Sequence, residues 1–175
     1  MNASAKHALP SFEAVYRAHY DYVWKTARRL GIPESQAEDV AHDVFLVVGR
    51  RLLEFRAEAE LRTWLFAITT RVVANLRRAQ SRRERREQAY EVHTQVEGRA
   101  SQSGGYARVD ASRLLYALLD ELDDPRRVVF ILADLEGCSA PEIAARLGVK
   151  LNTVYSRLRS ARQLMTQAMR RRDQP

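Results

Sequence analysis

The chain has 175 residues, 46% of them hydrophobic, which is enough for one ordinary domain or two small helical ones. Its formal charge of +7 and its pI near 10.0 favour a polyanionic partner, and nucleic acid is the first candidate for a basic chain of this size. The sequence contains no apolar run as long as a membrane span, no secretory signal in its first ten residues, and no metal-ligand spacing among its single cysteine and four scattered histidines.

These features predict a cytoplasmic protein without membrane insertion, metal or cofactor. The sequence also lacks a phosphate-cradling glycine-rich loop, a nucleophile elbow and an H-E-x-x-H pair. A catalytic function is therefore the least favoured class. Cys138 cannot form an internal disulfide, and its position favours a small packing residue over a redox sensor.

The first half of the chain has helical apolar spacing and no alternating strand pattern. Residues 12–30 form one predicted helix, which ends at Gly31 and Pro33. Ser35 and Glu38 have the spacing of a capping box that would open a second helix. A third helix is predicted over residues 61–78. The inward positions of the second and third helices are expected to be Val40, Val44, Val47 or Val48, Leu52, Leu65, Ile68, Val72 and Leu76.

Charge and composition change between the two halves. Residues 71–86 contain seven arginines and one acid, whereas residues 110–142 hold eight acids and three arginines. Residues 81–110 are rich in Arg, Gln, Glu, Ser and Gly with little apolar periodicity, which predicts a flexible linker whose first part can prolong the preceding helix. The expected organisation is all-α, with two small helical domains at residues 1–80 and 111–175.

The second half contains the strongest local pattern. Short helices are expected over residues 111–122 and 126–135, interrupted at Asp124 and Pro125. Ser139 and Glu142 then form a second capping box, which opens a short helix that stops at Gly148 before another helix starts at Leu151. A capped helix, a glycine turn and a basic helix occur in the order of a helix-turn-helix.

The last helix has a buried and a polar side. Apolar residues advance by four, three and four positions, and the opposite side is polar, so one face would pack and the other would suit a major groove. The basic face could instead be merely solvated, but residues 146–172 contain eight basic residues and no acid. The buried stripe is Val154, Leu158, Ala161 and Met165, the polar side is Asn152, Ser156, Arg159 and Gln163, and the flanks hold Tyr155, Arg157 and Arg162.

Three motifs carry a family resemblance. Residues 135–162 resemble the promoter-reading region of the extracytoplasmic-function (ECF) sigma factors, a subfamily of the sigma-70 superfamily of bacterial proteins. Ala37-Glu-Asp-Val-Ala-His-Asp-Val-Phe-Leu46 is similar to the polymerase-binding helix of that family, and Trp64-Leu-Phe-Ala-Ile68 to its Trp-Leu-x-x-Ile signature. The order and spacing of the three are more specific than any one of them.

The resemblance implies a role for each segment. Asp39, His42, Asp43 and Leu46 would face the clamp helices of the largest subunit of core RNA polymerase. The loop over residues 55–62 and the third helix would handle the minus-ten element. The residues implied in minus-ten binding are Arg62, Arg71, Asn75 and Arg78, and those implied in minus-thirty-five binding are Asn152, Thr153, Tyr155, Ser156, Arg157, Arg159 and Arg162.

Several alternatives remain at this level. Trp64 and Phe66 could stack on bases, although an aromatic residue at helical spacing more often belongs to a core. Asp39 and Asp43 could be ordinary solvated acids. The family implies promoter DNA, core polymerase and an anti-sigma factor as partners, whereas a conventional helix-turn-helix regulator would work without polymerase and a sigma mimic would only titrate an anti-sigma factor.

Overall fold

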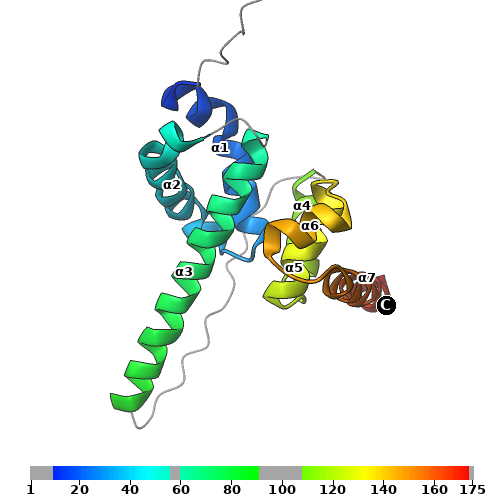
Figure 1. Cartoon of the computed structure of the whole chain (residues 1–175). Helices are drawn as coiled ribbons and strands as arrows, with labels where there is room; N and C mark the ends of the chain where they lie inside the picture. The colour runs from blue at the N-terminus through cyan, green and yellow to red at the C-terminus, as the bar shows by residue number, and fades with distance from the viewer. Residues whose placement is uncertain (1–9, 56–59, 91–107, 174–175) are drawn as a thin grey trace, which may run out of the picture. The chain divides into compact units, whose positions relative to one another are not determined.

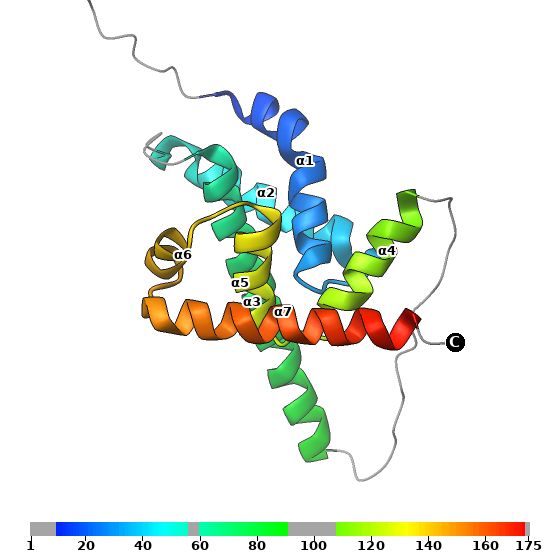
Figure 2. The same ribbon diagram turned by 90° about the vertical axis from the view of Figure 1, so that its right-hand side faces the viewer.

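The computed structural model describes residues 10–55, 60–90 and 108–173, and these residues form helices and turns with no β-strand (Figures 1 and 2). The all-α prediction is confirmed. The chain divides into two compact units, of which the first contains α1 to α3 and the second contains α4 to α7. None of the described helices is long and apolar enough to span a bilayer.

The first unit is built on α1 (Phe12–Arg29), α2 (Glu34–Arg51), the short 3-10 turn η1 (Leu52–Glu54) and α3 (Leu61–Tyr90). Its core combines aliphatic residues from all of these elements with an aromatic cluster around Phe45, on which Tyr16 and Tyr20 pack with ring centroids 4.7 and 6.1 Å away. The predicted inward residues Val40, Val44 and Val48 are buried. The core comprises Val15, Val23, Ala41, Val44, Phe45, Val48, Leu52, Leu65 and Ile68.

Two details of this unit differ from the expectation. The predicted capping box at Ser35 and Glu38 is wrong, because α2 starts at Glu34, directly after Pro33, and has no side-chain cap. The extended backbone of Pro33 already ends the preceding turn, and its carbonyl accepts from the amide of Gln36 at 3.0 Å. On α3, Leu65 and Ile68 are buried and Val72 packs half-buried on the core as predicted, whereas Val73, which was not predicted to face inward, is buried as well.

Helix α3 runs twelve residues past its predicted end at residue 78. The added segment is rich in Arg, Glu, Gln and Ala, which have high helix propensity and need no apolar face to continue a helix once it has started. It thus occupies the first ten residues of the predicted linker. Residues 91–107, the remainder of that linker apart from the start of α4, lie outside the described part of the chain.

The second unit contains α4 (Arg108–Leu119), α5 (Asp124–Phe130), the wide π-turn η2 (Ile131–Leu135), α6 (Ala140–Leu147) and α7 (Leu151–Asp173). Helix α7 packs against α4, α5 and α6. The four residues of its predicted stripe are all buried. They meet a core from the other helices that includes Leu119, Val129, Ile131, Leu132 and Ile143.

The helix ends of this unit follow from local chemistry. Asp123 caps α5, and Pro125 lies in the first turn, where its missing amide costs nothing. The predicted α-helix over residues 126–135 instead widens at residue 131, where the amide of Glu136 donates to the carbonyl of Ile131 at 3.0 Å. The capping box of Ser139 and Glu142 is confirmed, as is the helix stop at Gly148, which has a left-handed φ of 63°.

Candidate nucleic-acid and protein interfaces

The outer face of α2 brings its four predicted site residues together. Asp39, His42, Asp43 and Leu46 are all exposed. At about 100° per residue, each of the four side chains lies within about 60° of their mean direction around the helix axis. They face away from the buried valines of α2. Leu46 is 60% exposed, and Leu53 in η1 is 87% exposed. An acidic surface with exposed leucines suits a contact with a basic, partly apolar protein surface.

His42 and Tyr20 join this face to α1. Their rings are 6.0 Å apart between centroids, so the imidazole is at the edge of the aromatic cluster. Burial raises the pKa of Tyr20, and the nearby charge of Glu38 acts in the same direction. The phenol therefore stays neutral at physiological pH. The acids at positions 39 and 43 define the charge of the surface.

On α3, three of the four predicted minus-ten residues share one stripe. Arg71, Asn75 and Arg78 are exposed and lie at spacings of four and three residues, within an arc of about 60° around the helix. A guanidinium nitrogen of Arg78 donates to the side-chain oxygen of Asn75 at 2.5 Å. Donors and acceptors are therefore arranged side by side along this stripe.

Arg62 is separated from that stripe. It precedes Arg71 by nine residues, which is about half a turn around the helix and about 13 Å along it. Its guanidinium lies over the ring of Tyr22, 4.3 Å from the centroid. The pKa of His19 is lowered by burial and, secondarily, by the charge of Arg62. Part of the predicted loop before Arg62, residues 56–59, lies outside the described residues.

The two aromatic residues of the Trp-Leu-x-x-Ile motif are used in packing. Phe66 is only 5% exposed. Trp64 is half-buried, packs on the core of the unit and lies 5.3 Å from Phe55 between ring centroids. Of the two alternatives for these residues, base stacking or a core position, Phe66 takes the core position. Trp64 keeps only part of its ring surface exposed.

The polar face of α7 is arranged as its spacing predicts. Asn152, Ser156 and Arg159 are exposed and lie within an arc of about 60° around the helix, opposite the buried stripe. A surface hollow runs along this side, lined by Tyr155, Ser156, Arg159, Ser160 and Gln163. Lys150 precedes the helix, and its backbone carbonyl accepts a hydrogen bond from the amide of Thr153 at 2.9 Å. Its side chain has no acceptor that could cap the helix.

The remaining predicted minus-thirty-five residues occupy two different flanks. Tyr155, 53% exposed, and Arg162 lie on one flank of the polar face, within about 80° of its centre. Thr153 and Arg157 are half-buried on the other flank, and Arg157 is about 140° from the centre. The fold thus separates Arg157 from the residues with which it was grouped.

Arg162 is held by an acid that the sequence did not single out. Its Nη2 and Nε donate to the two carboxylate oxygens of Asp134 at 2.6 and 3.1 Å. These hydrogen bonds raise the pKa of Arg162 above its ordinary value. Asp134 belongs to the acidic segment, but the partners are 28 positions apart in the sequence, which left no local signal of the pairing.

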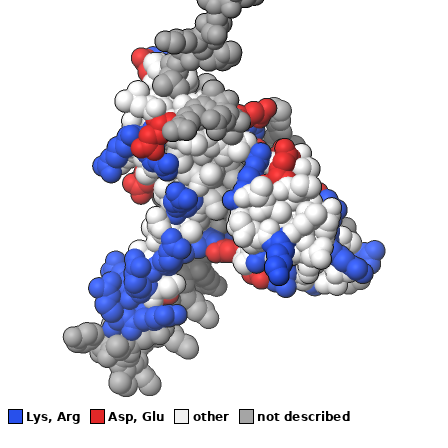
Figure 3. Space-filling view, viewed as in Figure 1, with Lys and Arg blue, Asp and Glu red and all other residues white. Residues whose placement is uncertain are grey.

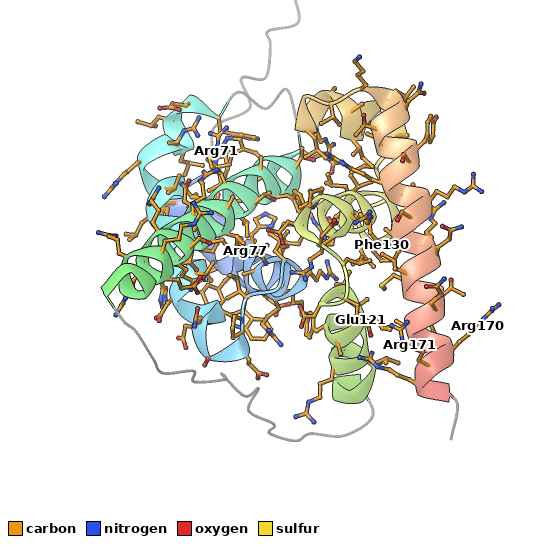
Figure 4. All side chains as sticks on the ribbon, turned by 90° about the horizontal axis from the view of Figure 1, so that it is seen from below. Arg71, Arg77, Glu121, Phe130, Arg170 and Arg171 are labelled. Carbon is orange, nitrogen blue, oxygen red and sulfur yellow. The ribbon has the colours of Figure 1, made fainter. Side chains whose placement is uncertain are left out.

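The basic end of α7 is also partly paired. Arg171 and Arg172 both form ion pairs with Glu121, and Figure 4 shows Arg171 beside Glu121 while Arg170 points away. On α5, Nε of Arg126 donates to Ser160 of α7 at 3.0 Å. Acids from the middle segment therefore neutralise part of the positive charge of α7.

Cys138 lies in the turn before α6. Its sulfur accepts a hydrogen bond from Arg146 at 2.9 Å, and burial raises the pKa of its thiol despite that neighbouring charge. A thiol with a raised pKa is a poor nucleophile. The described residues contain no group of three or more His, Cys, Asp or Glu side chains suited to a metal ion.

Comparison with known proteins identifies both units. The family model of sigma-70 region 2 matches residues 15–83, and that of sigma-70 region 4 matches residues 112–165. The chain is 32% identical over 149 residues to the RNA polymerase sigma factor CnrH of Cupriavidus metallidurans, covering 79% of this chain and 75% of CnrH. The chain belongs to the ECF sigma factors.

A second relative and a solved structure with the same fold were also found. The ECF sigma factor SigE of Mycolicibacterium smegmatis is 34% identical over 158 residues, which are 89% of this chain and 60% of that protein. The fold matches that of the sigma factor RpoE of Bartonella quintana, solved with the anti-sigma factor NepR, with a TM-score of 0.69 and 24% identity over 91% of this chain and 96% of RpoE. ECF sigma factors are non-enzymatic factors for promoter-specific transcription initiation.

Proposed function

We propose that this ECF sigma factor binds core RNA polymerase through α2 and reads two promoter elements with its two units. The observation that carries the proposal is the outer face of α2, where Asp39, His42, Asp43 and Leu46 are exposed together on a helix whose other side is core. A regulator that worked without polymerase would need no such surface. The clamp helices of the largest polymerase subunit are the proposed partner.

DNA would be bound at two places. The stripe of Arg71, Asn75 and Arg78 on α3 would hold the opened minus-ten strand, with Arg62 contributing from a separate position. Asn152, Ser156 and Arg159 would reach base edges of the minus-thirty-five duplex, and Tyr155 and Arg162 would approach phosphates from the flank. Thr153 and Arg157, on the other flank, would reach only phosphates and not base edges. The domain boundaries proposed for this division are residues 1–80 and 111–175.

Joining the two units in one chain would make binding bivalent. Once one element is bound, the other unit is held near its own site, so moderate affinities combine through effective concentration. An anti-sigma factor is a further proposed partner. The solved structure of CnrH, which is 28% identical to this chain with a TM-score of 0.62, contains the cytosolic domain of CnrY.

Run-off transcription with purified core polymerase and genomic fragments tests the proposal. The holoenzyme should give discrete transcripts that core polymerase alone does not give, and the sequences upstream of their start sites should share two elements. A chain that binds duplex DNA but neither binds core polymerase nor directs initiation would instead be a conventional regulator. Binding to an anti-sigma factor without initiation would indicate a sigma mimic.

A further inference from the structure

The last described turns of α3 carry an arginine stripe that the proposed promoter contacts do not use. Helix α3 projects beyond the packed part of α1 and α2 (Figure 1), and residues 79–86 are all exposed. Lys and Arg side chains gather over this projecting end (Figure 3). A helix segment that buries no apolar surface gains little from packing, so its sequence is not explained by the fold of the unit.

The register of the arginines is the decisive feature. Arg82 follows Arg78 by four residues, and Arg85 follows Arg82 by three. At about 100° per residue, both fall within about 40° of Arg71 around the helix. They therefore continue the stripe of Arg71, Asn75 and Arg78 rather than starting a new face. All five side chains are exposed.

This arrangement is unfavourable for the free protein. Like charges three and four residues apart on a helix destabilise it, and Glu84 is the only acid between Arg77 and Arg86. Within the described side chains, Arg86 donates from Nε to the carbonyl of Arg82 at 3.2 Å. A polyanion lying along the stripe would remove this repulsion.

The length of the stripe fits a nucleic-acid backbone. From Arg71 to Arg85 the helix rises about 21 Å, which equals the rise of about six base pairs along the axis of duplex DNA. Arginine is well suited to phosphates because its guanidinium donates two parallel hydrogen bonds.

We propose that Arg82 and Arg85 bind backbone phosphates of the duplex directly upstream of the minus-ten element, as a sequence-independent clamp. This inference rests on the proposed function. The stripe begins at the residues proposed to hold the minus-ten strand, and the chain continues beyond α3 to the unit proposed to read the more upstream element. The duplex between the two elements is thus the DNA that a continuation of the stripe would meet.

The experiment compares neighbouring arginines on the same helix. Arg82→Gln and the double variant R82Q/R85Q remove charge from the stripe, while Arg83→Gln removes the same charge about 100° away from Arg82. Glutamine keeps the helix propensity, and circular dichroism checks that folding is unchanged. Reconstituted holoenzyme is titrated with a promoter fragment recovered from run-off transcription, at several KCl concentrations.

The slope of log K against log salt should become shallower by about 0.9 for R82Q and about 1.8 for the double variant, with little change for R83Q. A second arm replaces the phosphates of about six nucleotides upstream of the minus-ten element with neutral methylphosphonates. That replacement should weaken the wild type and have a much smaller effect on the double variant. Base changes in the same stretch should leave both affinities unchanged.

Three results would overturn the inference: a wild-type slope for the double variant, an equal change for R83Q, or weaker binding of core polymerase by the double variant in the absence of DNA. The last result would assign the stripe to a protein contact. A wild-type chain that fails to bind polymerase would reject the proposed function and this inference with it. A fully active wild type beside an unaffected double variant would reject the clamp alone.

Discussion

The carboxylate of Asp134 holds the guanidinium of Arg162 through two hydrogen bonds, of 2.6 and 3.1 Å. Arg162 is proposed to approach DNA phosphate from the flank of α7. When DNA binds, its guanidinium must therefore break one or both hydrogen bonds to Asp134 or donate to the carboxylate and the phosphate together. Asp134 also places a negative charge close to the proposed DNA surface. The pair therefore opposes binding in the free protein.

We expect Asp134→Asn to tighten promoter binding by about two- to fivefold, because exposed ion pairs contribute about 0.2 to 1 kcal/mol. Salt titration of the reconstituted holoenzyme would measure this gain, which should be largest at low salt. In an Arg162→Gln background the same Asp134 substitution should have much less effect. A full gain in that background would show that Asp134 acts on DNA directly rather than through Arg162.

Substitution of Arg159 tests the reading face of α7. Arg159→Ala should relax discrimination at one position of the minus-thirty-five element by about 1 to 3 kcal/mol, because the side chain projects opposite the buried stripe. Competition binding with single-base promoter variants measures the effect. Arg157→Ala, on the half-buried flank, is the matched control and should leave base discrimination unchanged. Equal loss on every sequence would make Arg159 a phosphate contact.

Charge reversal on α2 tests the polymerase surface. Asp39→Lys with Asp43→Lys should leave helical content and melting temperature almost unchanged, since both acids are exposed. Pull-down of core polymerase should fail, because like charges across an interface can cost several kcal/mol and each 1.4 kcal/mol is about tenfold in affinity.

The control for this variant is Glu13→Lys with Asp21→Lys on α1, which makes the same charge change at two exposed positions outside the proposed surface. It should bind core polymerase like the wild type. If the folded α2 variant also binds and initiates normally, α2 does not dock on polymerase and the conventional-regulator interpretation is favoured.

The capping box of α6 makes stability depend on pH. The backbone amide and hydroxyl of Ser139 donate to Glu142 and lower the pKa of its carboxyl group. Because the folded pKa lies below the unfolded one, this stabilisation is fully present above the unfolded pKa and is lost as pH falls through the folded pKa. The difference in melting temperature between wild type and Glu142→Gln should therefore shrink below about pH 4.

Two further variants test whether the pH dependence of stability comes from the capping box or from the loss of any negative charge. Ser139→Ala should lower the free energy of unfolding by about 1 kcal/mol at neutral pH. Glu34→Gln removes a first-turn glutamate from α2, a helix without a side-chain cap, and should not reproduce the acid-dependent difference. If it does, the pH dependence does not arise from the box.

Arg127 is a buried cation that closes the end of α4. Its guanidinium donates to the carbonyls of Leu119, Asp120 and Leu122 at 2.8, 3.3 and 2.9 Å. Arg127→Met should lower the free energy of unfolding by about 2 to 3 kcal/mol, because buried carbonyls would lose their donor. Chemical denaturation measures the loss. Arg126→Met, at a half-buried neighbour, should cost clearly less, and equal costs would argue against the carbonyl contacts.

Much of the local structure was predictable because its causes are local. Ser139 and Glu142 reach each other within one helical turn, and Gly148 adopts a left-handed φ that its lack of a side chain permits. The buried positions of α7 follow from the period of the helix, as does the grouping of Asp39, His42, Asp43 and Leu46 on one face of α2. The family resemblance rested on the same short-range patterns.

Short-range patterns failed where two signals competed. Ser35 and Glu38 had the spacing of a capping box, but Pro33 already set the start of α2, so the serine fell inside the first turn. The predicted end of α3 at residue 78 relied on apolar periodicity, which says where a helix packs and not how far it extends, and only the composition of the linker's first part indicated that the helix could continue. The high helix propensity of residues 79–86 extended it without any packing.

The sequence alone therefore determined the all-helical class, the helix-turn-helix and the exposed faces of α2 and α7, because each depends on residues within one or two turns. Only the tertiary structure decided which basic side chains are paired with acids and which remain available to bind DNA. Arg162 meets Asp134 across 28 residues and Arg171 meets Glu121 across 50, and such pairs form only when packing brings separate helices together. The same packing buried Phe66 and left Arg157 half-buried, because the neighbouring helices decide how much of a helix surface is covered.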